Sequence, residues 1–332
     1  MSKEKTALQG EMLHNRLRKR YRHLKKWARR TGTTAFRLYD RDIPEIPLVL
    51  DLYGDAVSGA LYRRPYEKEE DEETRWLMTM KDAVSSSLEI PAARIFLKER
   101  RRQRGNDQYS RLPDQGVTLN VTEGGLRFTV NLSDYLDTGL FLDRRLLRAL
   151  IQSESAGKRV LNLFCYTASF SVYAAAGGAR EVDSVDLSPT YLKWAAVNFG
   201  CNGFTTRMIQ GREIRSHAAS FSLIRADALR FITEARKAGL TWDRIILDPP
   251  AFSNSKGMSA DLDLRQDHRD LITRTLDLLN PGGKLWFSAH IRRFHLKPED
   301  FPGTKIQDIT EQIRDEDFKG KKIPACYRFT LL

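Results

Sequence analysis

Residues 159–170 read RVLNLFCYTASF, a short apolar run followed by small and polar residues. The run predicts a buried strand that leads through a loop into a helix at 169–176, with Thr167 and Ser169 as candidate caps. A second strand, predicted at 181–186, ends in an acid. The order strand, loop, helix, strand and acid is typical of a nucleotide site in an α/β fold.

The loop also indicates which kind of nucleotide binds. Its backbone N–H groups face a ligand, and Asp186 at the end of the second strand can accept from both ribose hydroxyls. Residues 159–170 lack the GxGxxG pattern that holds a dinucleotide pyrophosphate. A nucleoside without phosphates fits better, and S-adenosylmethionine (SAM) is the common one.

A second motif follows at 241–252, TWDRIILDPPAF. Its apolar core at 245–247 predicts a buried strand, which the two prolines break at its carboxyl end, where open α/β sheets bind their ligands. The prolines remove two N–H donors and leave outward carbonyls beside the Asp248 carboxylate. Phe252 can stack on a flat base. The alternative is a strand terminator with a core Phe, but the order of the two motifs argues against it.

Composition limits the class of protein. The 332 residues are 41% hydrophobic, which supports packed cores, and no apolar run is long enough to span a membrane. The basic N-terminus lacks an apolar leader segment, and the three cysteines lack metal-ligand spacing. We therefore expect a cytoplasmic protein with no membrane segment and no metal site.

Positive charge is concentrated at the N-terminus. Of the net charge of +12, residues 1–30 carry +9; we expect 1–10 to be disordered and 11–30 to form an amphipathic helix. Nucleic-acid contact is favoured over a solvated face or a membrane surface, because the charge is lopsided and the apolar face is narrow. A second basic cluster beside Tyr109 also suits RNA. The predicted RNA-binding residues are Arg16, Arg20, Lys25, Lys26, Arg100, Arg101, Arg102 and Arg104.

We predict four segments along the chain. Residues 1–32 form the basic helix, 33–112 a small α+β RNA-binding domain, 113–134 a hairpin linker and 135–332 the SAM-binding domain. In the last segment strands and helices alternate, which predicts an α/β fold with a doubly wound, Rossmann-like sheet.

Several local features of that domain can also be predicted. Asp143 is a candidate cap for a helix that carries Arg145 in its first turn, where an arginine can reach a ligand carboxylate. Residues 205–220 are predicted to form a long loop or an extra helix. We expect a helix at 268–279 and an antiparallel edge strand at 327–331.

The two motifs argue for methyl transfer from SAM, an in-line displacement in which positioning supplies most of the catalysis. Carbon-5 methylation of a pyrimidine needs a cysteine nucleophile, and none stands beside Asp248 or in residues 287–290. Guanine N7 needs no base, whereas an exocyclic amine needs acceptors, which Asp248 and the Pro249 carbonyl can supply. The residues leave these two open. We expect His290 and His295 to be scattered surface residues rather than a base or metal ligands.

Four segments, YLDTGLFLDRRLLR, VLNLFCYTASF, VDSVDLS and DRIILDPPAFSNSK, together resemble the RlmK half of the bifunctional bacterial RlmKL rRNA methyltransferases. FRLYDRDIPEIPLVLDLYGD and NRLRKRYRHLKKWA are similar to N-terminal segments of that family, so the resemblance covers nearly the whole chain. It implies a SAM-dependent enzyme that makes 7-methylguanosine in 23S rRNA or a pre-large-subunit particle and releases S-adenosylhomocysteine. The THUMP-containing half of the family is absent here, which makes a separate THUMP-type chain a candidate partner.

The resemblance also implies roles for residues. Arg145 would approach the methionine carboxylate of SAM, and Asp227 the adenine amino group. The residues implied to hold the target guanine are Asp248, Pro249, Pro250 and Phe252. The residues implied to bind SAM are Arg145, Asn162, Phe164, Cys165, Tyr166, Thr167, Asp186, Leu187, Asp227, Ala228 and Asp248.

Three departures from the family pattern accompany these roles. Ala168 stands where the family usually has glycine, which adds one methyl group to the loop. Residues 287–293 replace an Asn-rich segment, and the connection at 205–220 is longer than usual.

Two further functions are open from the residues. One is an RNA methyltransferase that acts on an exocyclic amine or on cytosine C5. The other is a non-catalytic RNA-binding assembly factor with a decayed SAM fold, a hypothesis suggested by Ala168 in the loop. The intact acids Asp186 and Asp227 and the complete DPPAF argue against decay.

Overall fold

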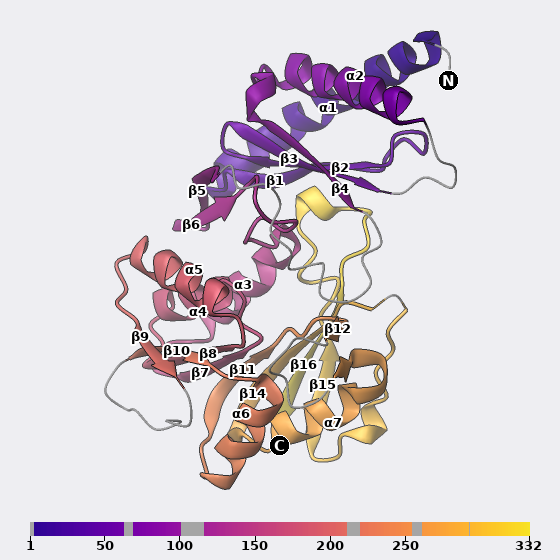
Figure 1. The fold of residues 1–332 in the computed structure, drawn as a ribbon. Helices are drawn as coiled ribbons and strands as arrows, with labels where there is room; N and C mark the ends of the chain where they lie inside the picture. The colour runs from indigo at the N-terminus through magenta and orange to yellow at the C-terminus, as the bar shows by residue number, and fades with distance from the viewer. Residues whose placement is uncertain (1–2, 63–68, 101–115, 211–219, 254–260, 292) are drawn as a thin grey trace. The chain divides into compact units, whose positions relative to one another are not determined.

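The computed structural model describes residues 3–62, 69–100, 116–210, 220–253, 261–291 and 293–332. The chain forms two compact units (Figure 1). The first comprises Met1–Thr138 and Glu316–Lys321, and the second comprises Gly139–Asp315 and Lys322–Leu332.

The first unit is built on a four-stranded sheet in the order β1-β2-β3-β4. The strands are β1 (Ala35–Asp40), β2 (Leu48–Tyr53), β3 (Ala56–Tyr62) and β4 (Ile95–Arg100), and only the β3–β4 pair is parallel. Helices α1 (Lys3–Thr31) and α2 (Glu70–Leu88) pack side by side over the sheet (Figure 1). A hairpin of β5 (Thr118–Glu123) and β6 (Leu126–Asn131) completes the part of this unit before residue 138.

Helix α1 begins at Lys3, so the prediction that residues 1–10 are disordered is wrong for 3–10. The physical reason is its packing on α2. The Trp76 indole donates to Gln9 Oε1 at 2.6 Å, and Gly10 lies so close to Thr79 that a Cβ there would meet its methyl group at 3.0 Å. Further along, α1 is amphipathic as predicted: Tyr21 is partly buried, and the buried apolar side chains are Leu13, Leu17, Leu24, Trp27 and Ala28.

Residues 316–321 belong to the first unit although they lie near the end of the chain. Asp317 accepts from the Arg37 backbone N–H at 3.0 Å, and the Arg37 guanidinium stacks on Phe318 at 4.8 Å. Lys321 pairs with Asp42. Asp317 and Phe318 are both buried, so this short segment completes the core beside β1.

The second unit contains an eight-stranded sheet in the order β15-β16-β14-β11-β7-β8-β10-β9. Its strands are β7 (Arg159–Leu163), β8 (Glu181–Asp186), β9 (Arg207–Gln210), β10 (Phe221–Arg225), β11 (Trp242–Leu247), β14 (Leu279–Ala289), β15 (Thr304–Asp308) and β16 (Ala325–Leu331). The six strands from β9 to β14 run parallel, and β16 is antiparallel to both its neighbours.

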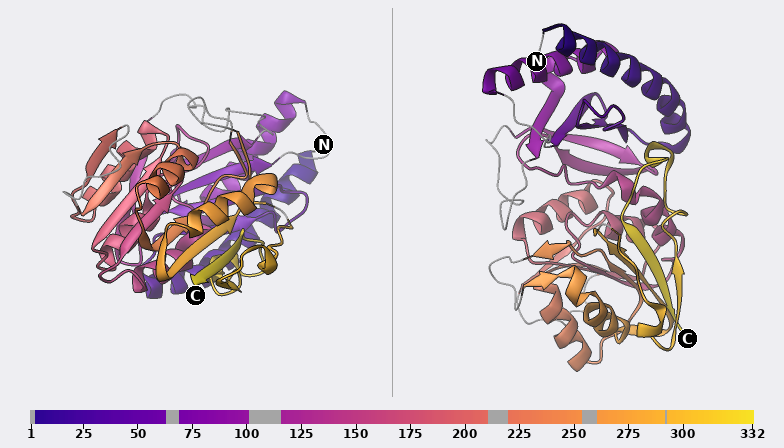
Figure 2. Two further views of the ribbon diagram at one scale, coloured as in Figure 1. Left: turned by 90° about the horizontal axis from the view of Figure 1, so that it is seen from below. Right: turned by 90° about the vertical axis from the view of Figure 1, so that its right-hand side faces the viewer.

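Helices cover both faces of this sheet, which confirms the predicted doubly wound α/β fold. In Figures 1 and 2, α3 (Arg145–Ser153), α4 (Ser169–Ala176) and α5 (Pro189–Gly200) lie on one face. Helices α6 (Ala228–Lys237) and α7 (Leu264–Leu276) lie on the other. In the described part of the chain, no helix is both long enough and apolar enough to cross a bilayer.

Three predictions for this unit are wrong in detail. Residues 207–210 form strand β9 at the sheet edge, because β10 offers free backbone groups there and Ile209 is buried against it; 211–219 lie outside the described residues. The strand after Ala325 is antiparallel but internal, since β15 pairs along its outer side. Helix α7 begins at Leu264, capped by Asp263, and residue 279 already belongs to β14.

Candidate active site

The two sequence motifs meet at one edge of the parallel sheet. Strands β7 and β11 are neighbours, and from them the chain proceeds outward to β8 and β10 on one side and to β14 on the other. Such a switch point opens a crevice at the carboxyl ends of the strands. The loop after β7 and the DPPAF segment after β11 therefore border the same crevice.

The loop after β7 is strained. Phe164, Tyr166 and Ala168 have φ angles of 56°, 53° and 59°, the left-handed region that costs about 1–2 kcal/mol for each non-glycine residue. Backbone bonds hold it: Cys165 N–H donates to Val185 O at 2.9 Å, and Ala168 N–H donates to Cys165 O at 2.8 Å. Ala168 has a backbone conformation that a glycine would adopt without strain.

The predicted helix caps at Thr167 and Ser169 are wrong. Ala168 occupies the N-cap position of α4 without a side-chain cap bond. The Thr167 hydroxyl instead donates to Gly139 O at 2.6 Å, and Asn198 donates to the Thr167 carbonyl at 2.9 Å. These bonds fix the loop from outside the helix.

Asp186 stands at the end of β8 as predicted. Its carboxylate accepts from the backbone N–H of Tyr166 and of Ser188, each at 2.9 Å, and from Leu187 N–H. Burial raises the pKa of Asp186 to about 6, and these three bonds oppose the rise. The acid is thus held beside the loop after β7, where ribose hydroxyls are expected.

Asp227 follows β10 at the neighbouring strand end. It is the N-cap of α6, with its Oδ1 accepting from Leu229 N–H at 3.2 Å, and both Asp227 and Ala228 are buried. The Ala226 N–H donates to Asp186 O at 3.1 Å, which joins the two strand ends.

Aromatic rings surround Tyr166 on the outer side of the loop. Its ring centroid lies 4.5 Å from that of Tyr191, 5.3 Å from that of Phe141 and 6.4 Å from that of Trp194. Phe141 is 38% exposed. The cluster gives the loop an aromatic border beside the Asp186 carboxylate.

Two residues predicted to contact SAM, Asn162 and Arg145, bind other side chains of the protein in the structure. Asn162 is only 1% exposed, and its amide donates to Ser171 Oγ at 2.9 Å, which ties β7 to α4 beneath the loop. Arg145 opens α3 as predicted, but its guanidinium pairs with Asp315 at 2.8 Å. The thiol of Cys165 is buried, and burial raises its pKa.

Asp248 has two partners that the sequence reasoning missed. Arg144 is fully buried, and its Nη2 donates to Asp248 Oδ1 at 3.1 Å while Nε donates to Oδ2 at 3.4 Å. His290 Nε2 lies 2.9 Å from the same Oδ1. Although burial alone would raise the pKa of Asp248, these two partners hold it far below its usual range.

The positions of these partners correct two predictions. His290 follows β14 and contacts the motif acid, so it is not a scattered surface residue. Asp143 caps no helix: the N-cap of α3 is Arg144, and Asp143 Oδ2 lies 3.7 Å from Arg144 Nη1. The signal in the sequence was the pair of arginines in LFLDRR, but the prediction took the second arginine, in the first turn of the helix, instead of the first.

The DPPAF segment leaves the sheet after Asp248. Pro249 is buried and Pro250 partly so, while Phe252 is 46% exposed. Phe252 begins a two-residue strand, β12 (Phe252–Ser253), that pairs with β13 (Leu262–Asp263). The ring is thus held on a short ribbon and left open to solvent.

The predicted RNA-binding side chains of α1 differ in their surroundings. Arg16 pairs with Asp42 at 2.8 Å, and Arg20 donates to the Asp317 carbonyl at 3.2 Å, so both stabilise the first unit. Lys25 and Lys26 are exposed. The Arg100 side chain and Arg101, Arg102 and Arg104 lie outside the described residues.

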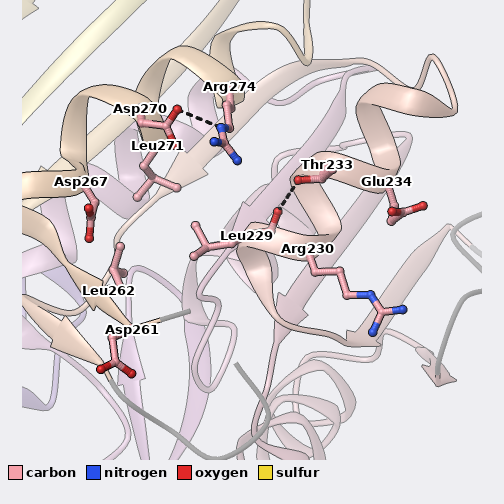
Figure 3. A pocket seen from close by; sticks show the side chains of 10 residues that line it. All are labelled: Leu229, Arg230, Thr233, Glu234, Asp261, Leu262, Asp267, Asp270, Leu271 and Arg274. Carbon is pink, nitrogen blue, oxygen red and sulfur yellow. Dashed lines mark hydrogen bonds and ion pairs between the residues drawn. The ribbon is translucent and has the colours of Figure 1, made fainter. Parts of the chain in front are cut away.

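A surface cavity of about 390 Å³ lies between α6 and α7 (Figure 3). Leu229, Leu262 and Leu271 form its apolar part, and Arg274 pairs with Asp270 at its rim. Neither the loop after β7 nor Asp248 contributes to its lining, so this cavity is separate from the crevice at the two motifs.

Comparison with known proteins shows the class of protein to which this chain belongs. Residues 46–299 match the S-adenosylmethionine-dependent methyltransferase family, and the chain belongs to that family. SAM is therefore its cofactor, as the motifs predicted. A putative methyltransferase, SMU.776, solved in complex with SAH, has the same fold, with a TM-score of 0.73 at 23% identity over 97% of this chain and 82% of that one.

The particular relatives confirm the resemblance seen in the motifs. Ribosomal RNA large subunit methyltransferase K of Neisseria meningitidis serogroup B is 42% identical over 94% of this chain and 85% of its own length. Ribosomal RNA large subunit methyltransferase K/L of Ectopseudomonas mendocina is also 42% identical, over 97% of this chain. This chain spans only 42% of the length of that K/L relative.

Proposed function

We propose that this chain transfers the methyl group of SAM to N7 of a guanine in 23S rRNA. Its similarity to relatives named ribosomal RNA large subunit methyltransferase K supports large-subunit rRNA as the substrate. The low pKa of Asp248 and its two hydrogen-bond partners favour N7 over an exocyclic amine as the target atom. The substrate is free rRNA or a pre-large-subunit particle, and the site of reaction is the cytoplasm.

Asp248 is a poor proton acceptor. Arg144 and His290 occupy its carboxylate, and its pKa lies far below the usual range. An exocyclic amine must lose a proton when it is methylated, so it needs a base whose pKa is near the working pH. Guanine N7 attacks with its own lone pair and loses no proton. A stable carboxylate suits this reaction, since it can offset the positive charge that develops on the base.

Two of the three cysteines are buried, which argues against a role for either in the carbon-5 alternative. Burial raises the pKa of the Cys326 thiol to about 12, and it also raises the pKa of the Cys165 thiol. A nucleophilic cysteine needs a depressed pKa and access to the base. Neither thiol meets these conditions.

The proposed roles of the site residues follow from their positions. We assign SAM to the crevice lined by residues 164–167, Asp186, Leu187, Asp227 and Ala228, with Arg145 and Asn162 supporting its walls. Asp248, Pro249, Pro250 and Phe252 border the place of the guanine, and the exposed Phe252 ring is suited to stacking on it.

The exposed cations of α1 support contact with RNA. Besides Lys5, seven basic side chains are exposed along this helix, and none of these seven pairs with an acid in the part of the chain that the structure describes: Arg18, Lys19, Arg22, Lys25, Lys26, Arg29 and Arg30. Helix α1 thus presents a strip of charge that phosphates can neutralise. A separate THUMP-type methyltransferase chain remains a proposed partner.

Nucleoside mass spectrometry on 23S rRNA that lacks its native modification, incubated with the protein and labelled SAM, tests the proposal. We expect new 7-methylguanosine, lost in Asp248→Ala while RNA binding is retained. A different methylated nucleoside would overturn the target atom. Failure to bind SAM would favour a non-catalytic assembly factor.

A further inference from the structure

Phe141 is an exposed aromatic residue just before α3, and the sequence prediction did not include it among the site residues. Its side chain is 38% exposed, whereas Leu140 and Leu142 on either side of it are each only 3% exposed. Its carbonyl accepts from the Arg144 backbone N–H at 3.2 Å and from Arg148 Nη1 at 2.9 Å, and Arg148 is fully buried. The backbone of Phe141 is therefore fixed, while its ring is open to solvent.

The Phe141 ring lies close to two residues that bind the two motif acids. Its centroid is 5.3 Å from that of Tyr166, in the loop after β7, and 6.4 Å from that of His290, which follows β14. The Tyr166 backbone N–H donates to Asp186 at 2.9 Å, and His290 Nε2 lies 2.9 Å from Asp248 Oδ1. The ring thus joins the neighbour of one acid to the neighbour of the other.

The same interval must hold the sulfur of SAM. The proposed ribose place is at Asp186, which ends β8, and the proposed guanine place is at Asp248, which follows β11. Strand β7 lies between these two strands in the sheet. The sulfur of SAM is one carbon removed from the ribose ring, and its methyl group must point at the nucleophile. The sulfur therefore lies between the two acids, near the end of β7, which is the interval that the Phe141 ring spans.

We propose that the ring of Phe141 lies against the sulfonium of SAM and attracts it through a cation–π contact. This inference rests on the proposed places of the ribose and the guanine, and it adds a residue that distinguishes SAM from its product. The face of an aromatic ring carries partial negative charge and attracts a ligand cation within about 6 Å of its centroid. Phe141 offers such a face on a fixed backbone.

Methyl transfer removes the charge that the ring recognises. The N7 lone pair forms the new N–C bond, and the S–CH3 bond breaks with its electrons left on sulfur. SAM is cationic at sulfur, whereas S-adenosylhomocysteine is a neutral thioether of nearly the same shape. The contact therefore stabilises bound SAM and adds little to the binding of S-adenosylhomocysteine, so it favours exchange of the spent cofactor for a fresh one.

A substitution that keeps apolar volume but removes the ring face tests the contact. Calorimetry on the full chain, with SAM and S-adenosylhomocysteine titrated separately, measures both affinities. We expect Phe141→Leu to weaken SAM binding roughly 2- to 30-fold, the range of one cation–π contact, and to leave the affinity for S-adenosylhomocysteine nearly unchanged. Phe141→Tyr keeps a ring face and should bind SAM as wild type does. Phe252→Leu, the same change at another exposed phenylalanine, is the matched control and should leave the ratio of the two affinities unchanged.

The possible results separate this contact from a merely structural role. Equal losses for both ligands in F141L would make the ring a packing surface and overturn the inference. Unchanged SAM affinity in F141L would also overturn it, as would an F141Y variant that binds SAM as weakly as F141L. Retained binding of S-adenosylhomocysteine shows that F141L is folded, and Phe141→Met is a second ring-free variant if it is not. The titrations contain no RNA, so a wild-type enzyme that binds SAM but makes no 7-methylguanosine refutes the proposed target atom and not this contact.

Discussion

Replacing Arg144 with methionine should destabilise the second unit more than most single substitutions. The change leaves the Asp248 carboxylate, which is only 11% exposed, with His290 as its remaining partner. Removing one partner of a buried ion pair costs about 3–5 kcal/mol, because the other charge stays buried. For a unit of this size that corresponds to a drop in melting temperature of roughly 6–20 °C.

The effect should depend on pH. Arg144 and His290 depress the pKa of Asp248 against the effect of burial, so their stabilisation is present above the unfolded value of 3.8 and is lost as the pH falls through the folded pKa. In the Arg144→Met variant burial dominates and raises that pKa, so the carboxyl takes up a proton well above pH 3.8. The gap in stability between the two proteins should therefore be full near pH 7 and narrow as the medium becomes acidic.

Thermal unfolding followed by circular dichroism between pH 4 and pH 8 measures this gap. The double variant Arg144→Met with Asp248→Asn removes both charges and should regain most of the lost stability at pH 7. A double variant as unstable as Arg144→Met alone, or a single variant that melts with wild type at pH 7, would refute the reasoning.

Three other changes test the remaining sites. Burial places the pKa of Asp186 at about 6, so SAM affinity measured by calorimetry should fall below pH 6, and a flat profile from pH 5 to 8 would remove Asp186 from the ribose site. Phe252→Ala should raise KM for RNA about tenfold without changing SAM affinity, the loss of one stacked base; equal effects on both ligands would contradict a role in the target pocket. Substituting Lys25, Lys26 and Arg29 with alanine should reduce the slope of log affinity against log salt by roughly 2–3, and an unchanged slope would place the RNA elsewhere.

The strands of the two motifs could be predicted from the sequence because their patterns are local. The apolar runs before Phe164 and Asp248 are each bounded by loop residues, and each indicates a strand of a parallel sheet that is buried on both faces. Strand β9 was missed because Arg207 and Gln210 hide the apolar pattern, and only an open edge on β10 makes it a strand.

The partners of Asp248 were missed for a different reason. Arg144 precedes it by about a hundred residues, and His290 follows it by about forty. No local pattern joins residues so far apart, because the fold brings them together: Asp248 and His290 follow adjacent strands, and Arg144 precedes α3. The place of Arg145 in the first turn of its helix predicted that it would reach the ligand; in the structure the first arginine of the pair, Arg144, binds the acid.

The segment Glu316–Lys321 has a consequence for the order in which the protein is made. The first unit begins with the first helix of the chain, yet its buried Asp317 and Phe318 leave the ribosome only when nearly all of the second unit has been synthesised. Contacts across so long a stretch form slowly, and domains otherwise tend to fold in the order of synthesis. The nascent first unit therefore cannot complete its core beside β1 until translation is almost finished.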